Sequence, residues 1–234
     1  MQKPDADDSL VVSYLSLRKA VGFIGFTLPF VLAIGKILSG NPGIEPSISH
    51  YYYTNMGDFL VGSLCAIGVF LMSTRGYPTP KLTAGLPGHD HIAGILASIF
   101  AIGVALFPTS YNEDHVTGTG PLHLACAGLL FLTLAYFCIE LFTRTTAEKP
   151  SKQKRQRNVI YYTCGYAILV CILLIAVAAL PPIKLSVEHL NPRFWLESIA
   201  IIAFGLAWLT KGEAILKDEE KQAEQAGGAA AGKK

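Results

Sequence analysis

The residues KQKRQRN at positions 152–158 are followed by VIYYTCGYAILVCILLIAVAAL at 159–180, and this junction decides the class of fold. No charged side chain occurs in the 22 residues 159–180. An α-helix needs about 20 consecutive apolar residues to cross a bilayer, so this segment predicts a transmembrane helix. The basic segment before it predicts the cytoplasmic end of that helix, because Lys and Arg concentrate on the cytoplasmic side of membrane proteins.

Five further apolar stretches occur along the 234 residues, at 20–39, 57–73, 91–107, 121–143 and 194–210. Only 15% of the residues are charged and 51% are hydrophobic, whereas soluble domains contain about 25% charged residues. We therefore predict an all-α integral membrane protein, a bundle of six transmembrane helices across residues 16–212. An N-terminal cytoplasmic segment (1–15) precedes the bundle, and a charged tail (213–234), which we expect to be disordered, follows it.

The distribution of basic residues predicts the orientation of the bundle. Sixteen of the 19 Lys and Arg residues lie in residues 1–19, in the 74–90 and 144–158 connections and in residues 211–234. The alternate connections contain only Lys184 and Arg193. This asymmetry places both termini in the cytoplasm. The 144–158 connection is the most basic one, and we interpret it as an anchor on the cytoplasmic side. The alternative interpretation is that it contacts anionic lipid head groups. A net charge of +2 gives no indication of nucleic-acid binding.

A stripe of small residues runs along the 91–107 stretch. Ala93, Ala97, Ala101 and Ala105 recur every four positions, which is one face of a helix. Small side chains allow helix backbones to approach closely in lipid, so this helix is expected to be central and tightly packed.

Three helices that enter the bilayer from the outer side carry an ionisable residue near their start: Asp58, His123 and Glu197. Exposing such groups to lipid is costly, so we expect them to face the bundle interior or a wet cavity. Small residues on the same helical faces favour this orientation. Together with His50 from the preceding loop, they predict an outer-side pocket for a small molecule, a lipid head group or an ion.

Each of these residues also has a simpler structural explanation. Asp58 can complement the positive end of its helix, and His123 can be an interfacial histidine bonded to a loop carbonyl. Glu197 is the deepest of the three and has no nearby helix end to cap, which favours a functional or inter-helix role. The sequence contains no His-x-x-x-His, His-Glu-x-x-His or Cys-x-x-Cys pattern, so it assigns no metal or cofactor.

Three short motifs resemble a family of bacterial six-helix membrane proteins known only as a domain of unknown function. These motifs are SISHYYY at 47–53 leading to Asp58, ALFPT at 105–109, and GPLH at 120–123. The resemblance covers about residues 16–212 and implies the bacterial cytoplasmic membrane as the location. A more distant similarity is to the damage-regulated autophagy modulators, which also place a histidine at the start of a middle helix. Neither resemblance implies a reaction.

Ser47 or Ser49, with Asp58 and His123, is also similar to the metal-binding set of the ceramidase and progestin-receptor superfamily. That similarity implies an alternative function, a metal-dependent membrane hydrolase of lipid amides or esters. The chain departs from the superfamily pattern, because it has six predicted helices instead of seven and no histidine in its last one. A third interpretation is a structural partner subunit whose polar residues only join helices.

Overall fold

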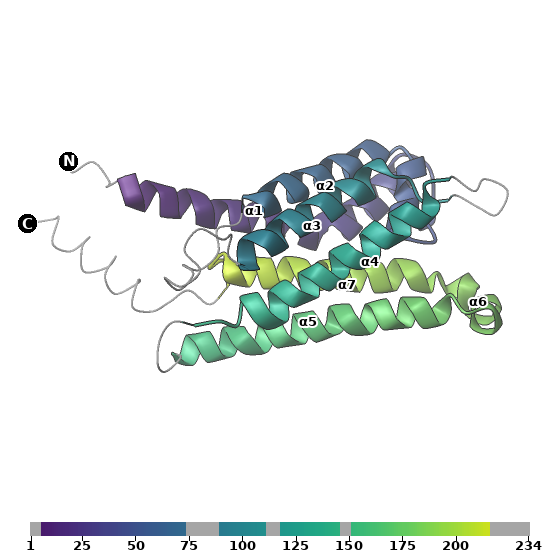
Figure 1. The fold of residues 1–234 in the computed structure, drawn as a ribbon. Helices are drawn as coiled ribbons and strands as arrows, with labels where there is room; N and C mark the ends of the chain where they lie inside the picture. The colour runs from purple at the N-terminus through teal and green to yellow at the C-terminus, as the bar shows by residue number, and fades with distance from the viewer. Residues whose placement is uncertain (1–5, 74–88, 111–117, 146–150, 216–234) are drawn as a thin grey trace, which may run out of the picture.

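A computed structural model describes residues 6–73, 89–110, 118–145 and 151–215 (Figure 1). The regular elements in these residues are all helices, which confirms the all-α prediction. The long ones are α1 (Ala6–Leu38), α2 (Gly57–Met72), α3 (His89–Leu106), α4 (Gly120–Tyr136), α5 (Lys152–Ala178) and α7 (Pro192–Lys211). The short ones are η1 (Ile48–Tyr53), the π-helical turn η3 (Phe137–Leu141), α6 (Pro181–Val187) and η4 (Glu188–Leu190).

Four helices are long and apolar enough to cross a bilayer: Leu15–Leu38, Gly120–Leu141, Lys152–Ala178 and Pro192–Lys211. The helices α2 and α3 are also apolar but shorter. The 16 residues of α2 rise about 24 Å at roughly 1.5 Å per residue, against a hydrocarbon core of about 30 Å. The described residues therefore indicate an integral membrane protein with four candidate spans.

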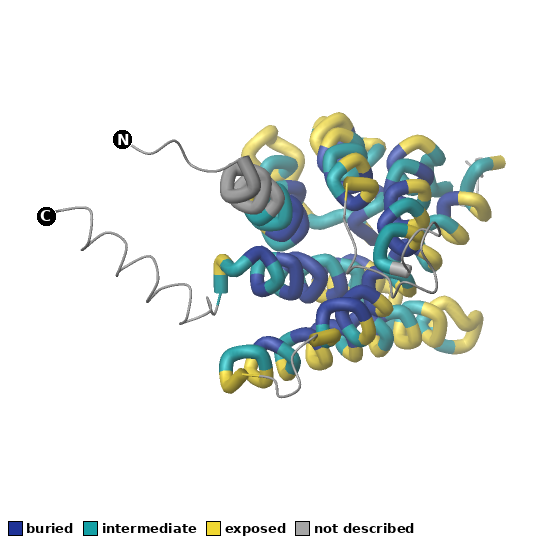
Figure 2. Tube along the Cα trace, turned by 60° about the vertical axis from the view of Figure 1, so that its left-hand side comes forward, coloured by how far each residue is buried: buried dark blue, intermediate teal, exposed yellow. Residues whose placement is uncertain are grey.

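The six long helices form a closed ring. Each helix from α1 to α5 packs against the next one, α5 packs against α7, and α7 returns to α1. Figure 2 shows buried residues gathered toward the middle of the ring and exposed residues on its outside. Large apolar side chains are exposed on these outer faces, among them Phe23, Phe59, Ile99, Leu124, Leu173 and Ile199. An outer surface of this kind is suited to contact with lipid.

The alanine stripe of α3 is buried as predicted. All four alanines are at most 5% exposed, and two of them have no exposed surface. The helix is tightly packed, but it is not central, because it occupies one place in the ring between α2 and α4.

Helices α1 and α7 pack with their backbones in close contact at Gly205. A Cβ atom placed on Gly205 would lie 2.7 Å from the Cα atom of Phe26 and 2.8 Å from the carbonyl oxygen of Gly22. Glycine is required at position 205 because a side chain there would occupy the space of the α1 backbone. This contact closes the ring.

The basic 144–158 segment is only partly a connection. Helix α5 begins at Lys152, so residues 152–158 form its first two turns, and the Ser151 hydroxyl accepts a hydrogen bond from the Lys154 amide at 3.1 Å. The basic side chains of these turns can extend to the membrane surface, so the helix can continue beyond the apolar stretch. Residues 146–150 of this segment, and residues 216–234 of the predicted tail, lie outside the described residues.

Candidate functional site

A short segment between α1 and α2, residues 45–54, covers one end of the ring; we call it the plug. It contains η1, and its residues Ser47, Ile48 and Tyr51 are at most 4% exposed. The Ser47 hydroxyl accepts a hydrogen bond from the His50 amide at 3.3 Å, which caps the first turn of η1. The same hydroxyl lies 2.6 Å from Nδ1 of His50. The plug is therefore a folded part of the protein.

Tyr51 fixes the plug from within. Its ring packs against Phe194 of α7, with ring centroids 6.2 Å apart, and its hydroxyl accepts a hydrogen bond from the Glu45 amide at 3.5 Å. Burial raises the pKa of the Tyr51 hydroxyl above its ordinary value, because the charged phenolate would lose its hydration. The neutral hydroxyl is the form that the folded plug favours.

Helix α7 holds the plug through Glu197. The Oε2 atom of this carboxylate accepts a hydrogen bond from the Ile48 amide at 2.7 Å, and the Ser49 amide is its second backbone partner. One turn earlier, the Phe194 amide donates to the carbonyl of Pro46 at 3.1 Å. Glu197 thus satisfies the first free amides of η1 in the way that a capping side chain does, although it comes from another helix.

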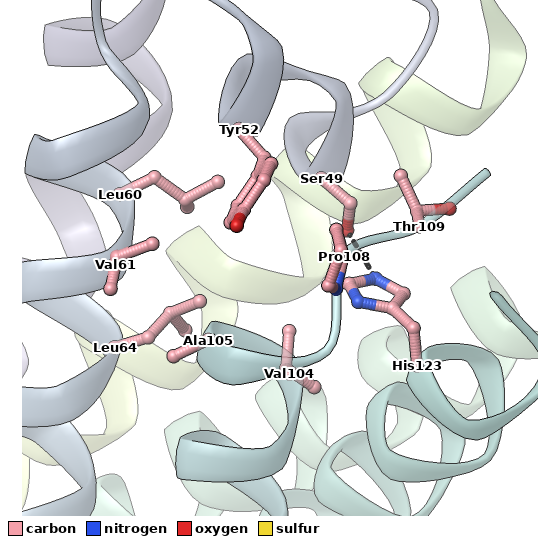
Figure 3. A pocket seen from close by; sticks show the side chains of 10 residues that line it. All are labelled: Ser49, Tyr52, Leu60, Val61, Leu64, Val104, Ala105, Pro108, Thr109 and His123. Carbon is pink, nitrogen blue, oxygen red and sulfur yellow. Dashed lines mark hydrogen bonds between the residues drawn. The ribbon is translucent and has the colours of Figure 1, made fainter. Parts of the chain in front are cut away.

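Helix α4 holds the plug through His123, which lies in its first turn. Nδ1 of His123 is 2.6 Å from the carbonyl oxygen of Phe107, at the end of α3. A carbonyl can only accept, so Nδ1 carries the hydrogen. In the neutral ring Nε2 is then an acceptor, and it lies 2.9 Å from the Ser49 hydroxyl (Figure 3). The predicted bond from this histidine to a carbonyl beside a loop is confirmed.

A cavity of about 60 Å³ lies beneath the plug, inside the ring. Fourteen residues from α1, η1, α2, α3, α4 and α7 line it, and twelve of them are apolar. The two polar ones, Ser49 and Glu197, belong to the plug end. A water molecule needs about 10–15 Å³ by this measure, so the cavity has room for several waters or a short apolar group.

A second, smaller cavity of about 10 Å³ lies beside the first. Its lining includes Ser49, Tyr52, Thr109 and His123 (Figure 3). Ser49 lines both cavities, so its side chain belongs to the wall between them. The hydroxyl of Tyr52 points into the smaller cavity in this view.

The four predicted site residues do not share one pocket. Glu197 and His123 come together at the plug, where they bind the neighbouring residues Ile48 and Ser49. His50 is in the plug, but it pairs with Ser47 and lines neither cavity. Asp58 is exposed in the first turn of α2 and also lines neither. Ligand binding by these residues stays a prediction.

The metal-binding set of the alternative hydrolase is not assembled. Within the described ranges, no group of three or more His, Cys, Asp or Glu side chains is placed to hold a metal ion. Asp58 lies on the exposed face of α2, and both ring nitrogens of His123 already have hydrogen-bond partners. The residues that we describe therefore give the metal-dependent alternative no support.

The sequence did not reveal Ser49 and the Ile48 amide as the partners of the two ionisable residues. His123 and Ser49 are 74 positions apart, and Glu197 and Ile48 are 149 positions apart. The signal in the sequence is the pair of serines before His50, which by itself does not indicate which helix each serine contacts.

Comparison with known proteins gives no match: no family model, no curated protein and no solved structure is significantly similar to this chain.

Proposed function

We propose that this chain is a six-pass membrane protein with both termini in the cytoplasm, and that its ring of helices binds a short apolar group of a small molecule or lipid. The observation that carries the proposal is the cavity beneath the plug, which is apolar except for a carboxylate and a hydroxyl at its outer end. This arrangement suits a ligand with an aliphatic body and a polar head.

The ring supports six passes. Helices α2 and α3 stand in it between α1 and α4, which are both long enough to cross a bilayer. They also expose apolar side chains outward, including Phe59 and Val69 of α2 and Leu96 and Ile99 of α3. Helices packed side by side with such surfaces belong at the same depth in a membrane. With six passes, the basic connections all fall on one side, which is the cytoplasmic one.

The topology is tested by labelling introduced cysteines in a variant whose five native cysteines are serine. Asn41 in the outer connection and Thr145 in the inner one are both exposed. An Asn41→Cys variant should react with a membrane-impermeant maleimide in intact cells, and a Thr145→Cys variant only after permeabilisation. Equal labelling of both in intact cells would contradict the proposed topology.

The Glu197 carboxylate gives the site its chemical preference. A carboxylate offers about four acceptor positions, and the backbone amides of Ile48 and Ser49 account for two hydrogen bonds. Acceptor capacity is left on the side that lines the cavity. A hydroxyl or amine head group can donate to it, while the twelve apolar residues surround the aliphatic part.

Binding is tested with a short-chain primary alcohol that carries a photoreactive diazirine in its chain. In wild-type protein, cross-links are expected on residues that line the cavity, such as Leu64 and Leu134. Ala127 lines the cavity, so Ala127→Leu should fill it and remove these cross-links. Ala125 lies on the exposed face of the same helix, and Ala125→Leu is the matched control. Unchanged cross-linking in Ala127→Leu would favour a purely structural role for the polar residues.

A further inference from the structure

Ser49 and His123 have the geometry of a nucleophile and its base. Nε2 of His123 lies 2.9 Å from the Ser49 hydroxyl oxygen, which is hydrogen-bond distance. The Phe107 carbonyl, 2.6 Å from Nδ1, fixes the ring orientation and the tautomer. Nε2 is therefore left as the acceptor that can take the Ser49 proton. A nucleophile, a base and a third group that orients the base are the parts that such a site requires.

The plug contains a second Ser–His pair that provides an internal comparison. Ser47 lies 2.6 Å from Nδ1 of His50, but Ser47 is only 1% exposed and its oxygen also caps η1. It lines neither cavity. Ser49, by contrast, is partly exposed and lines both. Hydrogen bonding alone does not distinguish the two serines; access to the cavity does.

We propose that Ser49 is the nucleophile, and His123 the general base, of an acyl-transfer reaction on a short-chain ester. The inference rests on the proposed function, because the short acyl chain occupies the cavity beneath the plug. Ser49 is one of the two polar residues that line this cavity, and the other lining side chains are apolar. The ester carbonyl then lies at the wall between the two cavities, with the leaving oxygen toward the smaller one.

Two balanced steps make up the reaction. The Ser49 oxygen bonds to the ester carbonyl carbon as its proton passes to Nε2 of His123; the ester C–O bond then breaks, and the leaving alkoxide takes that proton to become an alcohol. Water next attacks the acyl-serine and gives a proton to Nε2. The bond from Ser49 to the acyl carbon breaks, the serine oxygen regains the proton, and a short-chain carboxylic acid is released.

Tyr52 supplies the hydrogen-bond donor for the negative oxygen of each tetrahedral intermediate. Its hydroxyl points into the smaller cavity, which Ser49 and His123 also line (Figure 3). The amides of Ile48 and Ser49 do not take this role, because they are bonded to Glu197. While His123 is protonated, the Phe107 carbonyl continues to accept from Nδ1 and stabilises the imidazolium.

The test uses the full-length protein in detergent micelles and a fluorophosphonate with a short alkyl chain, which modifies activated serines. Intact mass and peptide mapping of the wild-type protein should show one adduct, at Ser49 and not at Ser47. Ser49→Ala should remove the adduct. His123→Ala should slow its formation by about 100-fold or more, the contribution typical of a general base. The wild-type mapping needs no variant, so it is decisive even if a variant fails to fold.

Three outcomes would overturn the inference. The first is a folded wild-type protein without an adduct at Ser49, and the second is an adduct at Ser47 as well. If the alcohol probe still cross-links within the cavity in either case, the binding site stands and acyl transfer is wrong. The third is an equal labelling rate with a methyl fluorophosphonate, which would show that no chain occupies the cavity and would contradict the proposed function too.

Discussion

Replacing Gly205 by alanine should destabilise the ring at its closure between α1 and α7. The added Cβ would lie 2.7 Å from the Cα atom of Phe26, well inside the 3.4 Å at which ordinary contact begins. The obstacle is backbone, so it cannot rotate away as a side chain can, and the two helices must separate. Overpacking of this kind costs about 1–3 kcal/mol. Alanine also favours a helix over glycine by roughly 0.5–1 kcal/mol, which must be separated from this cost.

Gly128→Ala provides that separation. Gly128 lies within α4, and a Cβ placed there would meet nothing within 4 Å. The gain in helix propensity is then the same in both variants, so the difference between their free energies of unfolding gives the cost of the clash alone. Free energies of unfolding should be measured by titrating the protein in mixed micelles with dodecyl sulfate. Trp208 fluorescence reports the transition, since this residue is buried among Phe137, Phe142 and Phe204.

Gly205→Ala should be less stable than Gly128→Ala by about 1–3 kcal/mol. Equal free energies of unfolding for the two variants would refute the reasoning, because α1 and α7 would then not be in the close contact that closes the ring.

The other predictions concern the plug. Glu197→Leu removes the acceptor of the Ile48 and Ser49 amides, so their hydrogen exchange should accelerate roughly tenfold or more, because a hydrogen bond to a charged group contributes about 1.5–3 kcal/mol. Glu197→Gln keeps an acceptor and should stay closer to wild type; equal protection in all three proteins would contradict the capping role. Asp58→Asn should change the free energy of unfolding by less than about 0.5 kcal/mol, because Asp58 is exposed. A loss of alcohol cross-linking in this variant would show instead that Asp58 takes part in binding. Burial raises the pKa of Tyr51, because the folded protein favours the neutral hydroxyl. The stability that this preference contributes is complete below about pH 10 and is lost as the pH rises further. Unfolding measured from pH 9 to pH 11 should show this loss in wild type and less of it in Tyr51→Phe.

Several features of the fold could be predicted from local sequence. The uncharged stretch at 159–180 lies within α5 up to Ala178, and the alanine stripe at 93–105 is buried. The inward placement expected for Glu197 and His123 is also found. These features can be predicted because each follows from a property of a single helix: its apolar length, its small side chains, or the free-energy cost of exposing a charge to lipid.

Other features depend on how the segments pack. The charge pattern predicts a connection over 144–158, whereas α5 begins at Lys152, within this basic segment. The sequence likewise gave no indication that the six helices form a ring in chain order, with α7 closing on α1. That closure depends on which surfaces meet, as at Gly205 and Phe26, and neighbouring residues in the sequence do not determine it.

Local sequence was enough to predict a helical membrane protein with ionisable groups near the starts of its apolar helices, because lipid penalises polar surface wherever it occurs in the chain. Which of these groups come together depends on the tertiary structure. Asp58 and Glu197 are both carboxylates near the starts of apolar helices, yet Asp58 is exposed and Glu197 binds the plug. The difference is the rotation of each helix about its own axis. Only packing against the neighbouring helices fixes that rotation, and with it the hydrogen bond between His123 and Ser49.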